Sequence, residues 1–234
     1  MNILVFGKHG QVASEINKKL KVKSLGKKDF NLLNYKKISK KIKSINPDFI
    51  INTSSYNFVD KAEINKDEAL IINALAPREI AKTCVKMKIP LIHFSTDYVF
   101  DGFRQKKYNT NDSVNPLNWY GKTKLIGENY IIKSKCNYNI IRTSWVFSEK
   151  KNNFVSKIIN NSEKGDLNVT IDEVGCPTPA SHLADVCVNI IKKYKLNKFK
   201  TGIFHYVGKP CVSRFEFSKI ILNKSLYNYF TKSF

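Results

Sequence analysis

The chain has 234 residues, of which 42% are hydrophobic and 12% aromatic, and its formal net charge is +21. This length and apolar content suffice for one large domain, or for one domain with a small attached lobe, and they exclude wholesale disorder. No apolar run approaches the roughly 18 residues that a membrane span requires. Only four of the 40 basic residues are arginine, and the lysines are scattered along the chain. The charge therefore indicates a solvated surface that attracts anions, and nucleic-acid binding ranks last among the functions that we consider.

The five cysteines lie at positions 84, 136, 176, 187 and 211. Their odd number and the lack of a C-x-x-C pair predict reduced thiols in a cytoplasmic protein, without a disulfide framework and without a zinc or other metal site. The first ten residues, MNILVFGKHG, have no basic region before the apolar run and no small cleavage-site residues after it. They therefore predict a first strand and not a signal peptide.

Apolar runs alternate with amphipathic, lysine-rich segments as far as residue 147. The predicted strands are 2–6, 21–25, 47–54, 90–100 and 138–147. The predicted helices are 11–20, 35–45, 67–87 and 121–134, and Pro77 is expected to divide the third of them. This alternation predicts the α/β class, with a Rossmann-like, doubly wound parallel sheet.

The pattern changes after residue 147. The predicted elements there are a helix and turn at 152–166, a short strand at 167–172 (LNVTID), a helix at 180–195, a strand at 202–208 and a final helix at 214–225. These pieces predict a small lobe beside the sheet that partly returns to it. We therefore expect a Rossmann domain over 1–147, with 172–207 returning to it, and a substrate-binding lobe over 148–171 and 208–234.

The segment GKHGQVA (7–13) joins the first predicted strand to the first predicted helix, with G-x-x-G-x-x-small spacing. Gly7 and Gly10 would allow a tight turn and a close backbone approach to a pyrophosphate at the helix N-terminus. Ala13 would allow close packing of the helix on the sheet. A plain tight turn would use the same residues, but the position between strand and helix favours a dinucleotide site.

Asp29 lies about twenty residues beyond the glycine turn, where an acidic residue can contact the adenosine ribose. Lys27 and Lys28 beside it could instead receive a 2′-phosphate. NADH and NADPH both remain open, and the two lysines favour NADPH.

The stretch HFSTDYVFDG (93–102) places Ser95 and Thr96 at the C-terminal end of a core strand, the edge at which ligands bind in open α/β sheets. Tyr120 and Lys124 form a Y-x-x-x-K pair one helical turn apart, on one face of a predicted helix. The phenol could give a proton to a carbonyl oxygen as a hydride arrives, and a nearby ammonium favours the phenolate. The lysine could also hold the ribose of a nicotinamide cofactor.

Seven segments keep their order over most of residues 1–208: GKHGQVA, NTSSYNFVDKAE, FSTDYVFDG, NPLNWYGKTKLIGE, RTSWVF, NNF and DEVGCPTPASHLADV. With them the chain resembles the extended short-chain dehydrogenase/reductases and, more narrowly, the dTDP-4-dehydrorhamnose reductase family. The resemblance implies a Rossmann domain that binds NADPH or NADH and a smaller lobe that binds a sugar nucleotide. It implies reduction of a nucleotide-linked 4-keto-6-deoxy sugar, dTDP-4-dehydro-β-L-rhamnose, to dTDP-L-rhamnose for surface polysaccharide synthesis, and it allows a homodimer.

The resemblance also assigns roles to residues. The catalytic residues would be Thr96, Tyr120 and Lys124. The cofactor-binding residues would be Gly7, Gly10, Gln11, Val12, Asp29, Phe30, Ser54, Ser55, Tyr56, Ser95, Tyr120 and Lys124. The substrate-binding residues would be Asn57, Val59, Thr96, Trp145, Pro177 and Thr178. For Trp145, which follows a buried strand, a purely structural place in the core is the alternative.

Three features depart from the family pattern. Ala13 replaces the third glycine of the turn, and Asn57 and Phe58 stand where the family usually has smaller residues, which would change the wall of the sugar pocket. After the last predicted helix the sequence lacks the family's Arg-Pro element, so we expect a substrate lobe that is abbreviated or truncated. Two alternatives to the reductase therefore stay open: a nucleotide-binding regulatory subunit of the kind that partners methionine adenosyltransferase, and a sugar-nucleotide epimerase or dehydratase.

Overall fold

The computed structural model describes residues 1–104, 106–149, 152–162, 164–165 and 167–223. The strands are β1 Ile3–Phe6, β2 Lys23–Leu25, β3 Phe49–Asn52, β4 Leu91–Thr96, β5 Tyr138–Thr143, β6 Val146–Phe147, β7 Val174–Gly175, β8 Thr178–Pro179, β9 Gly202–His205 and β10 Val212–Ser213. The α-helices are α1 Gln11–Lys19, α2 Ile38–Ile45, α3 Val59–Ile64, α4 Lys66–Leu70, α5 Ala76–Met87, α6 Trp119–Ser134, α7 Phe154–Ser162, α8 Ala180–Lys195 and α9 Arg214–Leu222. Shorter helical pieces are the 3-10 turns η1 Leu32–Lys37 and η3 Asp97–Val99 and the π-helical turn η2 Ile71–Leu75.

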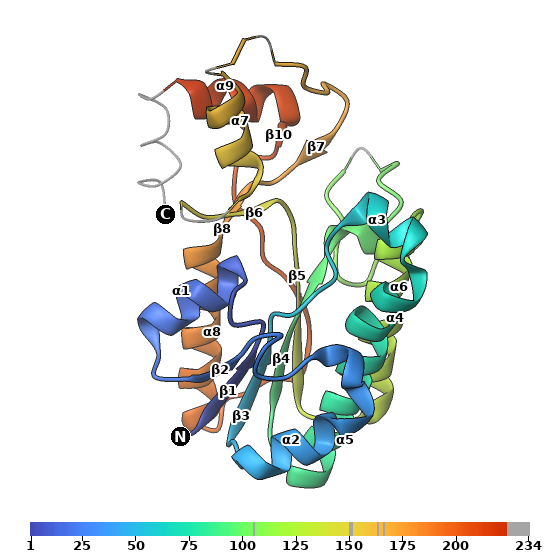
Figure 1. Ribbon diagram of the computed structural model, residues 1–234, viewed down its shortest axis with the longest axis vertical. Coiled ribbons are helices and arrows are strands. Elements are labelled where there is room, and N and C mark those ends of the chain that lie inside the picture. Colours follow the sequence, from blue (N-terminus) through green and yellow to red (C-terminus); the bar gives the residue numbers. More distant parts are fainter. Residues whose placement is uncertain (105, 150–151, 163, 166, 224–234) are drawn as a thin grey trace.

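Six parallel strands form the central sheet, in the order β2-β1-β3-β4-β5-β9. Figure 1 shows α1 and α8 on one face and α2, α5 and α6 on the other. Because helices cover both faces, every residue of β1, β3 and β4 is buried, which is why β1 and the first three residues of β3 are uniformly apolar. The predicted α/β, Rossmann-like sheet is confirmed. Its strand order reverses between β1 and β3, so this is the point at which a ligand is expected.

A hydrophobic cluster fills each side of the sheet. On the α1/α8 side, Ile16 and Leu183 pack against Ile51 and Ile92, and on the other side Ile42 and Ile80 pack with the strands. The predicted helix at 67–87 is divided near Pro77, as expected, but the division is the π-helical turn η2. Pro77 itself lies in the first turn of α5, where its missing N–H costs little.

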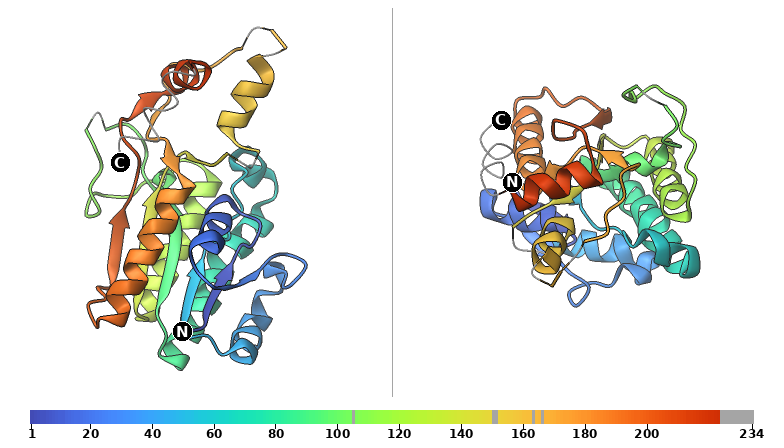
Figure 2. Two further views of the ribbon diagram at one scale, coloured as in Figure 1. Left: turned by 90° about the vertical axis from the view of Figure 1, so that its left-hand side faces the viewer. Right: turned by 90° about the horizontal axis from the view of Figure 1, so that it is seen from above.

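A small lobe, made of α7, α9, β7 and β10, stands beyond the carboxyl edge of the sheet (Figures 1 and 2). Val155 and Ile158 of α7 pack against Phe217 and Ile221 of α9. The strand predicted at 167–172 is absent from its described residues. Leu167 and Val169 pack against the α7/α9 cluster without a partner strand, whereas Ile171 is 73% exposed, so the alternating pattern reflects partial packing and not pairing. The last two residues of the predicted final helix, 224–225, lie outside the described residues.

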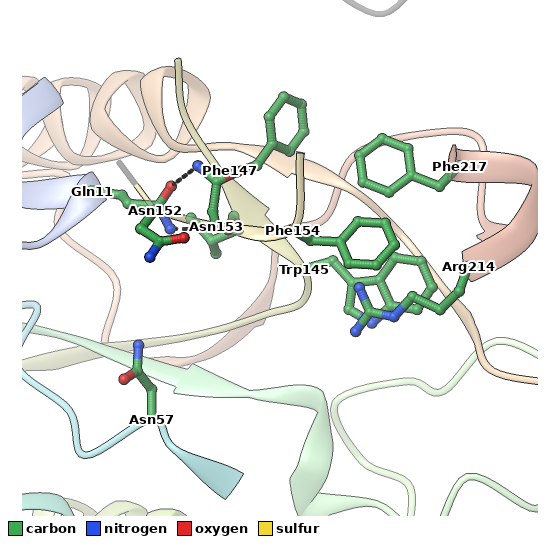
Figure 3. Close-up of a pocket in the computed structure, with 10 residues that line it drawn as sticks. Gln11, Asn57, Trp145, Phe147, Asn152, Asn153, Phe154, Arg214 and Phe217 are labelled. Atoms are coloured by element: carbon green, nitrogen blue, oxygen red, sulfur yellow. Dashed lines mark hydrogen bonds between the residues drawn. The ribbon is translucent and has the colours of Figure 1, made fainter. Parts of the chain in front are cut away.

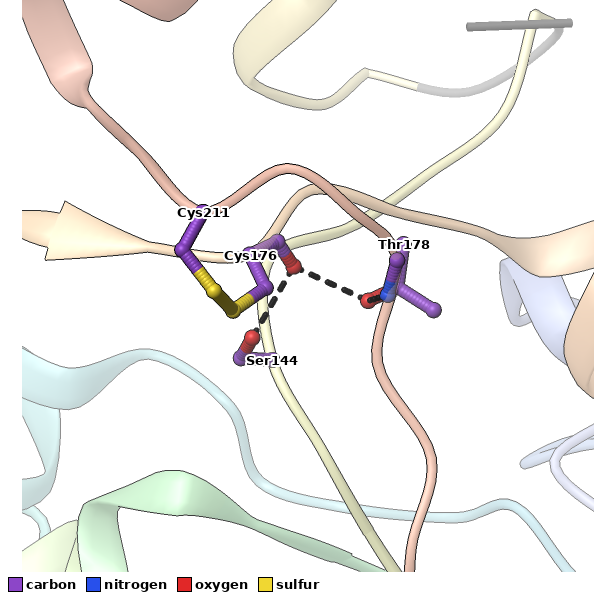
Figure 4. The surroundings of a disulfide bond; sticks show 5 residues. Ser144, Cys176, Thr178 and Cys211 are labelled. Atoms are coloured by element: carbon purple, nitrogen blue, oxygen red, sulfur yellow. Dashed lines mark hydrogen bonds between the residues drawn. A yellow bond between two sulfur atoms is a disulfide. The ribbon is translucent and has the colours of Figure 1, made fainter. Parts of the chain in front are cut away.

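A disulfide joins Cys176 to Cys211, so the prediction of reduced thiols was wrong for this pair (Figure 4). The two cysteines are 35 residues apart in sequence, but β7 and β10 pair antiparallel with Gly175 opposite Val212, which brings the flanking residues together. The other three cysteines are free and buried. Over the described residues, no group of three or more potential metal ligands occurs, and no helix is long and apolar enough to cross a membrane.

Candidate active site

The glycine turn lies at the carboxyl end of β1, beside the end of β3. Gly7 has a φ of +102°, and a β-carbon there would collide with the hydroxyl of Thr53, which is fixed by its bond to the Phe6 carbonyl. Gly10 caps α1 without any side-chain hydrogen bond, so the N–H groups of the first helical turn are left for a ligand. A close backbone approach and an uncapped helix N-terminus fit the pyrophosphate of a dinucleotide.

The predicted adenosine end lies just after β2. Asp29 accepts a hydrogen bond from the Gly26 amide at 2.8 Å, which together with the charge of Lys8 lowers the pKa of the Asp29 carboxyl. Lys27 and Lys28 are both exposed, so they could contact the 2′-phosphate of NADPH, and Asp29 could contact the ribose of NADH. Phe30 packs with the hydrophobic cluster on the α2/α5 side, and its ring is only partly buried.

Gln11, the first residue of α1, connects the turn to the segment after β5. Its amide donates to the Val146 carbonyl at 3.1 Å, and its oxygen accepts from Ser148 and Asn153, each at 2.9 Å. Val12 is partly buried against the α1/α8 cluster. The side chain of Gln11 therefore ties α1 to the segment that leads to the small lobe, and its backbone N–H lies in the uncapped first turn, where a phosphate would bind.

Asn73, in the π-helical turn, fixes the loop that follows β3. Its oxygen accepts from the Ser55 hydroxyl and the Tyr56 amide, and its NH₂ group donates to the Tyr56 carbonyl and the Thr123 hydroxyl. The side chain is completely buried, so its full capacity of four hydrogen bonds is used inside the protein. The sequence interpretation missed Asn73, although a lone amide in the apolar run ALIINALAP was a visible signal.

Val59 begins α3 and packs on the cluster that contains Tyr56 and Tyr120, and its contact with a substrate stays a prediction. Ser54, by contrast, is partly exposed beside Gly7, with its amide on the Asn52 side chain. The loop therefore places its predicted residues between the glycine turn and the α6 tyrosine.

The phenol of Tyr120 is buried, and the hydroxyls of Thr96 and Ser55 are near enough to favour its ionised form. Burial raises the pKa of Tyr120 to about 12, against the opposing effect of these hydroxyls. Thr96 bonds the Asp97 carboxyl at 3.1 Å, and burial raises the pKa of that carboxyl to about 6. The structure thus brings together the hydroxyls of Ser55, Thr96 and Tyr120, which were predicted separately. The sequence interpretation missed the neighbouring carboxyl of Asp97.

Lys124 is fully buried one turn further along α6. Its ammonium donates to the Phe94 carbonyl at 2.6 Å, and burial lowers its pKa to about 8, opposed by the charge of Glu128. Glu128 is itself paired with Arg142 at 2.6 Å. The sequence led us to expect that this ammonium lowers the pKa of Tyr120. The pKa of Tyr120 is raised instead, because burial is the largest effect on it, as it is on Lys124. The buried Ser95 hydroxyl has no hydrogen-bond partner among the described residues, so it is available to a ligand.

A pocket of about 240 Å³ lies between the sheet edge and the small lobe (Figure 3). The residues that line it are Gln11, Asn57, Trp145, Val146, Phe147, Asn152, Asn153, Phe154, Arg214 and Phe217. Trp145, held at a φ of +43°, faces the pocket, with Asn57 on the opposite wall, so two predicted substrate residues meet there. Phe58 does not line it and is 61% exposed.

Pro177 and Thr178 lie behind the pocket and do not line it. Thr178 is completely buried, its amide donates to the Trp145 carbonyl at 3.2 Å, and its hydroxyl donates to the Cys176 carbonyl (Figure 4). These residues therefore hold the backbone of Trp145 in place. The sequence interpretation assigned no role to Arg214 or Phe217, because nothing local connects α9 with a segment some seventy residues earlier in the chain.

Comparisons with known proteins agree with this geometry. The family model described as RmlD substrate binding domain matches residues 1–230. The dTDP-4-dehydrorhamnose reductase of Aggregatibacter actinomycetemcomitans is 33% identical over 232 residues, which cover 96% of this chain and 79% of that protein. Among solved structures, the dTDP-4-dehydrorhamnose reductase of Bacillus anthracis in complex with NADP matches with a TM-score of 0.89 and 29% identity, over 96% of this chain and 80% of that one. The corresponding Clostridium acetobutylicum structure matches with a TM-score of 0.88 and 35% identity, over 95% and 79%.

Proposed function

The chain belongs to the family of the RmlD substrate binding domain, and from that membership we propose that it is an NADPH- or NADH-dependent reductase of a nucleotide-linked 4-keto-6-deoxy sugar. The proposed substrate is dTDP-4-dehydro-β-L-rhamnose and the product dTDP-L-rhamnose, a precursor of surface polysaccharide. The observation that carries the proposal is the burial of Tyr120 and Lys124, one turn apart on α6, beside Thr96 at the carboxyl end of β4.

The residues at the edge fit a nicotinamide dinucleotide. Gly7 leaves no room for a side chain, and the first turn of α1 is uncapped, so the pyrophosphate would bind there. Asp29 or its neighbouring lysines would meet the adenosine end, and Lys124 would meet the nicotinamide ribose. When bound, the cofactor supplies the hydride that reduces the carbonyl carbon.

Tyr120 supplies the proton that balances this hydride. Its phenol transfers H⁺ to the carbonyl oxygen, so that the ketone becomes a secondary alcohol. Thr96, which lies beside the same phenol, would orient that oxygen. The charge of Lys124, one turn away, stabilises the phenolate that remains until a proton is recovered from water. Trp145 and Asn57, on opposite walls of the pocket, would enclose the sugar nucleotide.

The test is consumption of NADPH in the presence of dTDP-4-dehydro-β-L-rhamnose, followed at the reduced-nicotinamide absorbance band. Tyr120→Phe is expected to lower kcat by about 10²–10⁴-fold, the usual contribution of a positioned proton donor. Tyr130→Phe, on the same helix but under Arg78, is the matched control and should retain activity. Binding of NADPH without turnover of any 4-keto sugar nucleotide would contradict the reductase and favour a nucleotide-binding regulatory subunit.

We further propose that the sheet domain binds the cofactor and the small lobe binds the sugar nucleotide. The chain returns to the sheet domain after the small lobe, as supported by the packing of α8 on the sheet and the pairing of β9 with β5. Because β7 pairs with β10 of the small lobe, we place the beginning of the returning segment at Ala180 and not at residue 172. A cytoplasmic location belongs to the same proposal, since nicotinamide cofactors are kept reduced there. Light scattering of the purified protein would test the homodimer.

A further inference from the structure

Arg214 stands out in the pocket because it is the one charged side chain among the ten residues that line it. It is the first residue of α9, directly after Ser213, which forms a capping box with Glu216. The backbone amide of Arg214 donates to the Glu173 carbonyl at 3.0 Å. The N-terminus of α9 is therefore fixed at the mouth of the pocket by contacts that do not involve the arginine side chain.

The guanidinium lies over two aromatic rings of the pocket. Its carbon is 3.6 Å from the centre of the Trp145 ring system and 4.7 Å from that of Phe154 (Figure 3). Stacking of this kind fixes the plane of the guanidinium while leaving its edge free to donate. Only Nε has a hydrogen-bond acceptor among the described residues, the Glu173 carboxylate at 3.1 Å. The two Nη groups consequently keep their donors for a ligand.

Glu173 is a weak competitor for this cation. Its side chain is 55% exposed, whereas that of Arg214 is 18% exposed, so the ion pair is largely screened on the acid's side. The pocket itself contains no acidic side chain. A rigid cation with free donors in a pocket without acids is suited to a phosphate-type anion, which accepts two parallel N–H bonds from an arginine.

Arg214 also lies within electrostatic reach of the catalytic edge. Burial raises the pKa values of both Asp97 and Tyr98, and the positive charge of Arg214 acts against both increases. The guanidinium thus lies on the aromatic side chains of the pocket, within electrostatic reach of the two residues that follow Thr96. In a sugar nucleotide the diphosphate lies between the base and the sugar, so a diphosphate on Arg214 would leave the sugar free to extend toward the catalytic edge.

We propose that Arg214 binds the diphosphate of the sugar nucleotide, and that Glu173 holds the guanidinium until the diphosphate displaces it. This inference rests on the proposed function for the class of ligand. It differs from a purely structural role of Arg214, in which the arginine only attaches α9 to Trp145 and the ion pair with Glu173 supports the site.

Calorimetric titration with dTDP and with thymidine separates these roles, because the two ligands differ only in the diphosphate. Arg214→Gln should weaken dTDP binding by about tenfold or more, as expected for a lost charged hydrogen bond, and leave thymidine binding unchanged. Glu173→Gln should tighten dTDP binding, because it removes the competing carboxylate. The matched control is Arg78→Gln, since Arg78 likewise pairs with an acid, Glu79, and lies 5.3 Å from a ring, that of Tyr130, but lines no part of the pocket.

Three results would overturn the inference: equal losses of dTDP and thymidine binding in Arg214→Gln, weaker dTDP binding in Glu173→Gln, or no dTDP binding by the parent protein. The titration needs no turnover. A parent protein that binds dTDP through Arg214 but reduces no sugar would therefore contradict the proposed reductase alone. Conversely, a parent protein that turns over the sugar nucleotide, with KM unchanged in Arg214→Gln, would contradict the inference alone.

Discussion

Removal of the Asn73 side chain should disturb the site more than any comparable change in the helices behind it. In Asn73→Ala the amide and the carbonyl of Tyr56 both lose a buried partner. Each unsatisfied buried group costs about 1–3 kcal/mol, so the free energy of unfolding should fall by about 2–6 kcal/mol. The hydroxyls of Ser55 and Thr123 can turn to other acceptors, which is why they are left out of this sum.

Two variants make the Asn73 prediction specific. Asn73→Asp keeps the acceptor oxygen but sets a second oxygen against the Tyr56 carbonyl, so it should be about as harmful as alanine. Thr83→Ala is the matched control, because Thr83 is also fully buried but bonds only the Glu79 carbonyl within its own helix. It should cost about 1 kcal/mol and leave kcat unchanged.

Urea denaturation gives the free energies of these variants, provided that the slope with denaturant is unchanged. Activity measured well below the unfolding midpoint should fall for both Asn73 variants. In Asn73→Ala, Ser55, which lies beside the Tyr120 phenol, loses its anchor, and in Asn73→Asp the repulsion from the Tyr56 carbonyl displaces the same loop. A loss no larger than that of Thr83→Ala would refute the hydrogen-bond reasoning. A large loss of stability with unchanged kcat would refute the claim that Asn73 positions the site.

Three further changes test other parts of the molecule. Gly7→Ala should weaken NADPH binding by about tenfold or more in a fluorescence titration, whereas Gly102→Ala, also at a positive φ but facing open space, should not; equal effects would contradict the close-approach argument. Burial raises the pKa of Asp97 from 3.8 to about 6, so the folded state binds this proton more tightly and the carboxyl's contribution to stability falls as the pH rises between these values. Asp97→Asn should therefore gain about 1–3 kcal/mol relative to the parent between pH 4 and pH 7 in urea midpoints, and a relative loss would contradict the sign. Serine at both Cys176 and Cys211 should lower the free energy of unfolding by up to about 4 kcal/mol, since the bond closes a loop of 35 residues; dithiothreitol should lower it in the parent alone, and a parent insensitive to the reductant would refute the prediction.

The sheet was predictable because its signals are local. Strands covered on both faces need short apolar runs, and 3–6 (ILVF) and 49–51 (FII) are such runs within the predicted strands 2–6 and 47–54. The glycine turn was visible for the same reason, since Gly7 stands where the chain must leave β1 with a positive φ. Four-residue spacing likewise placed Tyr120 and Lys124 on one face of α6, and both are buried there.

Features that depend on distant segments were not predictable from these patterns. The Cys176–Cys211 bond follows from the pairing of β7 with β10, which are too short to leave a sequence signal of their own. The role of Arg214 depends on the meeting of α9 with the segment after β5. In residues 167–172 the apolar side chains do alternate, but Leu167 and Val169 pack on helices and Ile171 is exposed, and periodicity alone cannot distinguish this arrangement from strand pairing.

The electrostatics of the Tyr120–Lys124 pair show why spacing alone does not give mechanism. Burial acts on both groups in the direction of the neutral form, raising the tyrosine pKa to about 12 and lowering the lysine pKa to about 8. At pH 7 the Tyr120 phenol is therefore almost fully protonated, and Lys124 carries its positive charge in most of the molecules. A tyrosine with its ordinary pKa of about 10 is already protonated at pH 7, so burial adds nothing to that state and, by raising the pKa, makes Tyr120 a weaker acid. Proton transfer therefore needs a charge that stabilises the phenolate as it forms, and in the proposed mechanism the ammonium of Lys124 supplies that charge.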